Sequence, residues 1–202
     1  MQQLFVDPLH EQFGAWPLAY IPYGGADHGE IASIACAVGN GDDAVFYAAW
    51  TAAADRLTAD AKIALERGHV ASARELFLRS AGFYAKSYPL LFGESVDPRL
   101  RSSFRLQVEA FDRGLALGCE PSLPMRIAFE DTTLPAYLIP AAGRAREVQP
   151  TIIFTNGYDG AMTDLNFASA VAASRRGYHA LIFEGPGQGE MLIEHGARLR
   201  PD

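Results

Sequence analysis

Two stretches near the carboxyl end of this 202-residue chain repeat one pattern, and this pattern restricts the fold more than any other feature. Each stretch is an apolar, strand-like run followed by a glycine-rich turn. Residues 151–155 lead into residues 156–160, and residues 178–184 lead into residues 185–190. A spacer of helical length joins the two, which predicts a βαβ unit with both turns at the carboxyl ends of parallel strands. Open α/β sheets bind ligands at this edge, so we expect a functional site there.

Ahead of this unit, the first 118 residues are predicted to be almost wholly helical. Apolar residues recur there at intervals of three and four, over residues 29–38, 43–65, 73–88 and 98–118. Two prolines within residues 119–124 cannot continue a helix and mark a domain boundary. We therefore expect a helical domain at 1–118, serving as a cap or a dimerisation domain, and a second domain at 119–202.

The second domain begins with a predicted hairpin, in which strands 125–130 and 134–140 flank a turn at 131–133. The βαβ unit follows, with its helix capped by Asp164 or Thr163. The predicted fold class is therefore α/β, with a helical amino-terminal domain and a mixed sheet of about four strands. No helix is expected after the last strand, so this sheet should be incomplete.

Composition and charge exclude several classes of protein. The formal net charge of −7 argues against a nucleic-acid partner, which would require a basic face. No apolar run approaches the roughly 20 residues of a membrane helix, and the amino terminus does not have the pattern of a signal peptide. We expect a soluble, cytoplasmic protein.

The cysteines and histidines show no metal-site spacing, so no metal is expected. Cys36 and Cys119 are predicted to be buried, reduced thiols, with a disulfide as the alternative. His179 lies within a predicted strand and is expected in the core or a pocket. The other histidines are predicted at the surface, namely His10, His28, His69 and His195.

The turn at residues 156–160 has two interpretations. Its glycines can leave backbone N–H groups pointing into open space, as in loops that stabilise an oxyanion during acyl transfer. It can equally be a generic strand-to-helix turn. The second turn, residues 185–189, does not match a nucleotide-binding fingerprint, because its third glycine falls one residue early and a proline intervenes.

The motif pair resembles the α/β-hydrolase superfamily. Residues 157–160, the helical spacer, residues 176–178 and residues 183–189 carry the resemblance. The helical block ahead of them is similar to the branch whose members have a helical amino-terminal domain. The resemblance implies a Ser–Asp–His hydrolase without a cofactor. Its expected small-molecule substrate is a carbonyl compound or ester, cleaved at a C–C or ester bond beside the carbonyl.

Two residues take roles from this resemblance. Tyr158 matches the position whose backbone N–H contributes to the oxyanion hole. Asp159 matches an acidic position near the active site and could orient substrate or exchange protons, or it could be a turn or capping carboxylate.

The family's G-x-S-x-G nucleophile motif is not found in the 202 residues. The nearest match, around Ser95, ends in Asp97 and follows no predicted strand. We therefore expect this to be the amino-terminal portion of a hydrolase, inactive alone. The alternative is a truncated, non-catalytic module that forms a homodimer or binds a partner through its helical block or its open sheet edge.

Overall fold

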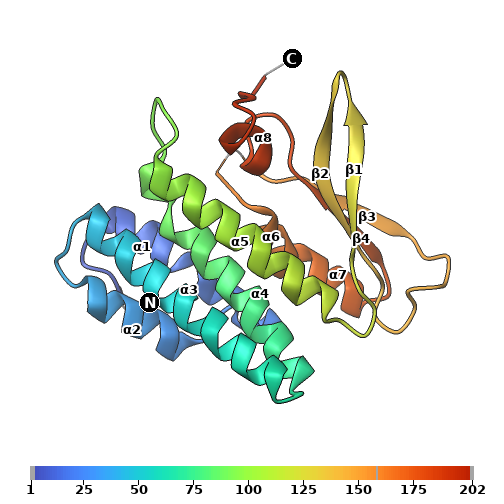
Figure 1. Ribbon diagram of the computed structural model, residues 1–202, viewed down its shortest axis with the longest axis horizontal. Coiled ribbons are helices and arrows are strands. Elements are labelled where there is room, and N and C mark those ends of the chain that lie inside the picture. The colour runs from blue at the N-terminus through green and yellow to red at the C-terminus, as the bar shows by residue number, and fades with distance from the viewer. Residues whose placement is uncertain (1–2, 158, 201–202) are drawn as a thin grey trace. The chain divides into compact units, whose positions relative to one another are not determined.

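The computed structural model describes residues 3–157 and 159–200. The chain divides into two compact units, Met1–Leu117 and Gly118–Asp202. The first unit is built from helices, and the second contains a four-stranded sheet with short helices (Figure 1). A helical amino-terminal region followed by a mixed open sheet is the predicted fold class, and the structure confirms it.

The helical unit is organised around three long helices, of which α4 packs against both α3 and α5. All four predicted helices are present, whereas α1 and η1 were not predicted. The elements are α1 (Pro8–Gly14), the 3-10 helix η1 (Trp16–Tyr23), α2 (His28–Val38), α3 (Asp43–Glu66), α4 (Val70–Ser87), the 3-10 turn η2 (Pro89–Leu91) and α5 (Pro98–Ala116).

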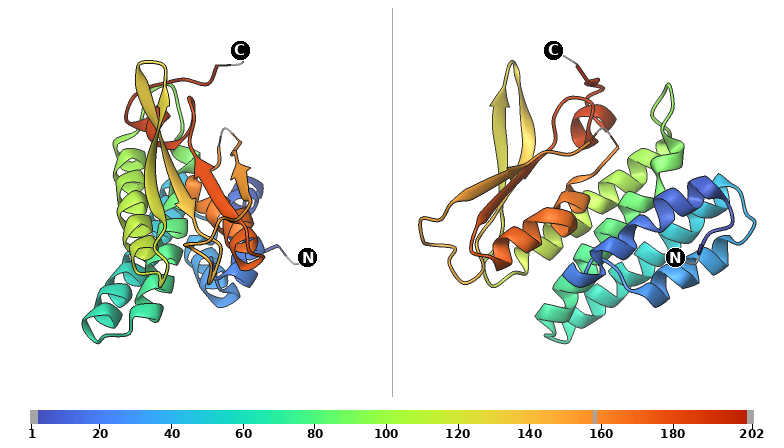
Figure 2. Two further views of the ribbon diagram at one scale, coloured as in Figure 1. Left: turned by 90° about the vertical axis from the view of Figure 1, so that its right-hand side faces the viewer. Right: turned by 180° about the vertical axis from the view of Figure 1, so that it is seen from behind.

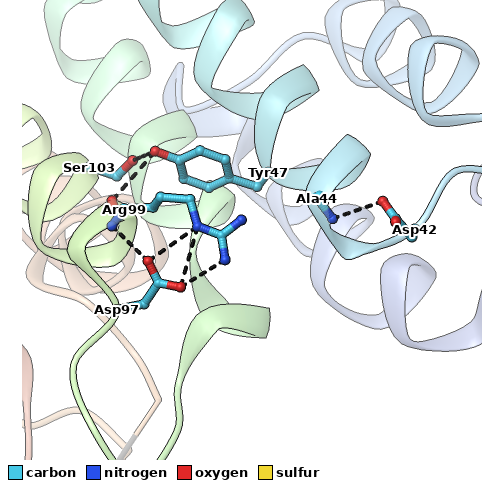
Figure 3. Close-up of polar contacts among 6 residues, drawn as sticks. All are labelled: Asp42, Ala44, Tyr47, Asp97, Arg99 and Ser103. Atoms are coloured by element: carbon cyan, nitrogen blue, oxygen red, sulfur yellow. Dashed lines mark hydrogen bonds and ion pairs between the residues drawn. The ribbon is translucent and has the colours of Figure 1, made fainter.

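Aspartates cap α3 and α5, and a tyrosine side chain of α3 contacts α5 (Figure 3). Asp42 caps α3 by accepting hydrogen bonds from two backbone N–H groups of the first turn, each at 3.1 Å. Asp97 caps α5 by accepting one hydrogen bond from a backbone N–H, that of Arg99 at 2.7 Å, and it also pairs with the Arg99 guanidinium at 2.7 Å. Tyr47 of α3 accepts a hydrogen bond from the Ser103 hydroxyl of α5 at 3.2 Å.

An aromatic core fills the amino-terminal part of this unit. The Trp50 ring is fully buried and meets Phe83 edge-on, with ring centroids 5.2 Å apart. Phe46 lies between Trp50 and His10, whose ring is 4.7 Å from that of Phe46. The prediction that His10 lies at the surface is therefore wrong: the side chain is buried, and its Nε2 lies 2.9 Å from an Asp43 carboxylate oxygen.

The second unit is a mixed sheet with strand order β1-β2-β4-β3. The strands are β1 (Leu123–Phe129), β2 (Thr132–Ile139), β3 (Thr151–Phe154) and β4 (His179–Phe183). β2 pairs antiparallel with both β1 and β4, and β3 pairs parallel with β4. The helical connection between β3 and β4 consists of α6 (Met162–Leu165), a π-helical turn η3 (Asn166–Ala170) and α7 (Val171–Arg175), and it packs against β4.

The hairpin turn is shorter than predicted. Phe129 pairs with Thr132, so only Glu130 and Asp131 remain between the strands. Glu130 adopts the left-handed region with φ of 50°, a conformation that a two-residue hairpin turn requires at its first position. The predicted turn residues Thr132 and Thr133 instead belong to β2.

One strand of the parallel pair lies at the edge of the sheet. β3 is bonded to β4 on one side, and no described strand pairs with its other side (Figure 2). Its side chains are largely exposed, with Ile153 at 62%. The strand that precedes the second turn lies inside the sheet and is followed by a short helix, α8 (Gly189–Ile193). The expectation of no helix after that strand is therefore wrong.

Two other expectations concern the surface. Within residues 3–157 and 159–200, no helix combines the length and apolar character that crossing a membrane requires. Cys36 and Cys119 are both free thiols, which agrees with the preferred interpretation. Both are exposed, however, so the prediction that they are buried is wrong.

Candidate functional site

Both glycine-rich turns lie at the same edge of the sheet, because they follow the adjacent parallel strands β3 and β4. We call residues 156–160 the first glycine loop and residues 185–189 the second glycine loop. The Gln188 side chain joins them: its Nε2 donates to the carbonyl oxygens of Asn156 at 2.7 Å and Gly157 at 2.9 Å. Its Oε1 accepts a hydrogen bond from the N–H of Gly185 at 2.9 Å. Gln188 therefore fixes the distance between the loops.

The first glycine loop is closed by its own asparagine. Asn156 Nδ2 donates to the carbonyl oxygen of Ala161 at 2.7 Å, and the N–H of Gly160 donates to the carbonyl oxygen of Gly157 at 3.4 Å. Gly160 is buried against the Asn156 amide, and a Cβ at this position would collide with it. A larger residue at this position would have to displace the Asn156 amide from its hydrogen bond to Ala161.

Some backbone donors of the first glycine loop remain available. The N–H groups of Gly157 and Asp159 donate no hydrogen bond to any residue that the structure describes. Tyr158, predicted to supply an oxyanion donor, lies outside the described residues, so that role stays a prediction. Among the described residues, the N–H groups of Gly157 and Asp159 therefore have no hydrogen-bond acceptor.

Asp159 is half-buried, and its carboxylate lies beside Gly157, with Oδ1 3.5 Å from where a Gly157 Cβ would stand. Within the described part of the chain, this carboxylate accepts no hydrogen bond and forms no ion pair. The first turn of α6 is served instead by Asp164, whose Oδ2 accepts from the N–H of Ala161 at 3.0 Å. Asp164 and Thr163 lie inside α6, so neither is the N-cap that the sequence predicts.

A buried carboxylate lies beneath both loops. Glu184 directly follows β4 and is 1% exposed. It accepts hydrogen bonds from the N–H groups of Met162 at 3.3 Å and Glu190 at 2.9 Å. These donors belong to the first turns of α6 and α8, so one side chain holds the helix that follows each loop. A Cβ at Gly189 would collide with this carboxylate. Burial raises the pKa of Glu184 to about 7, although the two backbone donors favour its ionised form.

The pKa of a second carboxylate nearby, that of Glu190, is shifted in the opposite direction. Burial disfavours ionisation of Glu190, but hydrogen bonds from Arg126 and His195 outweigh it and hold the pKa of Glu190 below its ordinary value. Arg126 Nη1 lies 2.5 Å from Glu190 Oε1, and His195 Nε2 lies 3.3 Å from the same oxygen. The two glutamates at this edge therefore differ in charge near neutral pH: Glu190 is ionised, and Glu184 is partly protonated.

No role for Glu184 or Gln188 follows from composition or spacing alone. The position of Glu184 in the sequence does give one signal, because it comes at the end of an apolar strand-like run and directly before a glycine turn. A carboxylate at such a position is seldom buried without hydrogen-bond partners, so burial would predict partners for it. Gln188 offers no such signal, since the partners that make it a link between the loops are backbone atoms 31 and 32 positions away in the chain.

The residues that the structure describes contain no group of three His, Cys, Asp or Glu side chains able to hold a metal ion. The two loops offer a linked pair of turns with backbone donors, a buried glutamate, and an aspartate that has no partner among the described residues. Of these groups, the backbone donors can stabilise developing negative charge. Neither loop contains a serine, threonine or cysteine that could act as the nucleophile.

Comparison with known proteins gives the site a context. No protein-family model matches the chain. It is 35% identical to the hydrolase acrC of Aspergillus aculeatus, over 92% of this chain and 46% of acrC. It is 32% identical to the α/β-hydrolase xenA of Xenoacremonium sinensis, over 89% of this chain and 42% of xenA. The chain therefore spans about half the length of the curated relatives it matches.

A solved structure supports the fold assignment. The crystal structure of 2,6-dihydroxy-pseudo-oxynicotine hydrolase superposes with a TM-score of 0.72, over 88% of this chain and 48% of the hydrolase. The two sequences are 20% identical, so this likeness concerns the fold. The helical region and the open sheet together match about half of a hydrolase structure.

Proposed function

We propose that this chain, a homologue of fungal α/β-hydrolases over about half of their length, is the amino-terminal portion of a serine-dependent hydrolase. The proposed enzyme cleaves a C–C or ester bond adjacent to a carbonyl group in a small-molecule substrate. The observation that carries the proposal is the closed first glycine loop, whose N–H groups at Gly157 and Asp159 are unbonded to described residues. Preorganised backbone donors of this kind stabilise an oxyanion without reorganisation during the reaction.

In the proposed mechanism, a serine attacks the substrate carbonyl, a histidine accepts the serine proton, and the N–H of Tyr158 donates to the oxyanion that forms. This chemistry needs no cofactor. Residues 1–202 contain no G-x-S-x-G, so the proposal assigns the nucleophile to sequence outside them. The 202-residue polypeptide by itself should then turn over no ester.

We assign the remaining roles as follows. Asp159, half-buried and unpaired among the described residues, orients the substrate or exchanges protons with it. The helical domain, residues 1–118, covers the site as a cap or forms a dimer interface. Glu184 and Gln188 hold the two loops together and do not touch the reacting atoms.

The Tyr158 assignment has a sharp test in the complete hydrolase. Tyr158→Pro removes the backbone N–H, whereas Tyr158→Phe keeps it and removes only the phenol hydroxyl. We expect the proline variant to lose roughly 10²–10³-fold in kcat, the usual effect of deleting one oxyanion donor, and the phenylalanine variant to retain activity. A large loss in the phenylalanine variant would assign the role to the side chain and contradict the proposal.

The exposed edge of β3 favours a second candidate function, a non-catalytic interaction module. An edge strand with unpaired backbone groups and exposed apolar side chains is a template for pairing with another strand. Ile153 is 62% exposed there. In this alternative the chain forms a homodimer by strand addition, and Ile153→Lys disrupts it whereas Val148→Lys, at a fully exposed position outside the strand, does not. Sedimentation showing a monomer for the unmodified chain would remove this alternative.

A further inference from the structure

The opposite edge of the sheet, at the amino ends of β3 and β4, carries a concave surface of a different character. A cavity of about 480 Å³ lies between the connection that leads into β3 and the end of α7. Its lining includes Arg144, Arg175 and Arg176, together with Gln149 and Tyr178. None of the described residues that line it is acidic. Three arginines among the lining residues make this surface more basic than the chain as a whole, whose net charge is −7. A carboxylate lies next to it, because Glu147 accepts a hydrogen bond from the lining residue Gln149 at 3.0 Å.

We propose that this cavity binds the phosphate group of a small molecule. A guanidinium presents N–H donors in a planar fork that matches phosphate oxygens, which makes arginine the preferred residue for such groups. The volume lies within the range of small-molecule sites. The ring of Tyr178, 39% exposed, offers an apolar surface for the remainder of the ligand.

The loop that carries Arg144 has no regular secondary structure, yet it is held on two sides. The Glu120 carboxylate accepts hydrogen bonds from the N–H groups of Gly143 at 2.6 Å and Ala145 at 3.0 Å. The N–H of Ala142 donates to the carbonyl oxygen of Ser174 at 3.0 Å, which ties the loop to α7. The arginine therefore projects from a fixed backbone, and this reduces the entropy lost when a ligand binds.

His179 provides a third attachment. Its Nδ1 accepts a hydrogen bond from the N–H of Ala141 at 3.0 Å, so the other ring nitrogen, Nε2, carries the proton and donates to the carbonyl oxygen of Glu147 at 3.1 Å. The predicted core or pocket histidine thus connects β4 to both ends of the arginine-bearing loop.

A simpler explanation accounts for part of the arginine cluster. Cationic side chains are favourable at helix carboxyl ends, and Arg176 Nη1 donates to the carbonyl oxygen of Ala172 in α7 at 3.0 Å. Arg144 lies at no helix end. Its guanidinium forms no hydrogen bond or ion pair with any residue in the described part of the chain. Helix capping therefore accounts for the position of Arg176 but not for that of Arg144, which a bound anion would explain.

The test uses inorganic pyrophosphate as the probe and the isotopically labelled 202-residue chain, followed by amide NMR. We expect shifts concentrated at residues 143–145 and 176–178. Arg144→Gln should weaken binding about tenfold, the equivalent of one charge-assisted hydrogen bond. Arg146→Gln is the matched control, because it removes the same charge from the same exposed loop without lining the cavity. Its affinity should stay within about twofold of the unmodified chain.

Three results would overturn the proposal. One is equal weakening by both variants, which would mean attraction to net charge alone. Another is shifts scattered over the surface, or none at millimolar pyrophosphate. The third is that a hexaglutamate peptide shifts these amide resonances whereas pyrophosphate does not, which would mean that the surface binds an acidic protein segment. Both substitutions are at exposed positions, so the folded state is expected to persist, and the amide spectrum reports it directly.

Discussion

Replacing Glu184 by glutamine isolates the energetic cost of the buried carboxylate that joins the two loops. Burial raises the pKa of Glu184 from 4.5 to about 7. The folded chain therefore binds more protons than the unfolded chain between these values, and stability must fall as pH rises through that interval. A difference of about 2.5 pKa units corresponds to about 3 kcal/mol of unfolding free energy. This contribution is fully present below pH 4.5 and is lost as the pH rises through 7.

Glutamine has nearly the shape of the protonated acid and cannot ionise. Near pH 5, Glu184→Gln should therefore be close in stability to the unmodified chain. At pH 8 the variant should be the more stable of the two by up to about 3 kcal/mol, although its amide can accept only one of the two backbone hydrogen bonds well. Glu147→Gln, at an exposed position, is the control and should show no such crossover.

The assay must report on the second unit, because Trp16 and Trp50 both lie in the helical unit and tryptophan fluorescence would miss the sheet. Urea titrations followed by the amide resonances of Ala180 and Ile182, both buried in β4, meet this need. Measurements at four pH values between 5 and 8 give the difference in unfolding free energy between variant and parent. A difference that does not change with pH would refute the reasoning.

Three further predictions concern the same edge. Gly160→Ala should destabilise the second unit by roughly 1–3 kcal/mol, because its Cβ would collide with the side-chain amide of Asn156. In the control Gly93→Ala the new Cβ meets no atom closer than 3.9 Å, so the unfolding free energy measured by urea titration should change by less than about 0.5 kcal/mol. Gln188→Ala should speed hydrogen exchange at residues 185 and 160 by loosening the contact between the loops, and unchanged exchange would contradict a bridging role. Arg126→Gln should raise the lowered pKa of Glu190, measured by carboxyl NMR. The pKa of Glu190 is lower in the folded chain than in the unfolded chain, so this carboxylate stabilises the fold at neutral pH and the stabilisation is lost on acidification. In Arg126→Gln this stabilisation should be smaller, by less than about 1 kcal/mol because the pair is partly exposed.

Local signals in the sequence were sufficient for much of the fold. Asp42 and Asp97 mark helix starts that the structure confirms, because capping depends on residues adjacent in the chain. The same signal was available for α1, where Asp7 precedes Pro8 and accepts from two backbone N–H groups, although this helix was not predicted. The parallel pairing of β3 and β4 followed from the repeated strand-and-turn pattern.

Features that depend on distant contacts could not be predicted in this way. His10 is buried because Phe46 and Asp43, more than 30 positions away, supply a ring and a carboxylate. β4 lies inside the sheet and β3 at its edge, since the order is set by pairing between β2 and β4 across about 45 residues of chain. The candidate site shows the same division: the loops were recognisable, but the side chains of Glu184 and Gln188 that connect them were not.

The central claim is that residues 1–202 supply the loop for the oxyanion and not the nucleophile. A fluorophosphonate probe, which labels activated serines, tests it most directly when applied to the 202-residue chain and to a complete hydrolase that contains this sequence. We predict no labelled serine in the 202-residue chain, and one labelled serine in the complete protein, within a G-x-S-x-G outside residues 1–202. A labelled serine among residues 1–202, accompanied by turnover of p-nitrophenyl esters, would contradict the account.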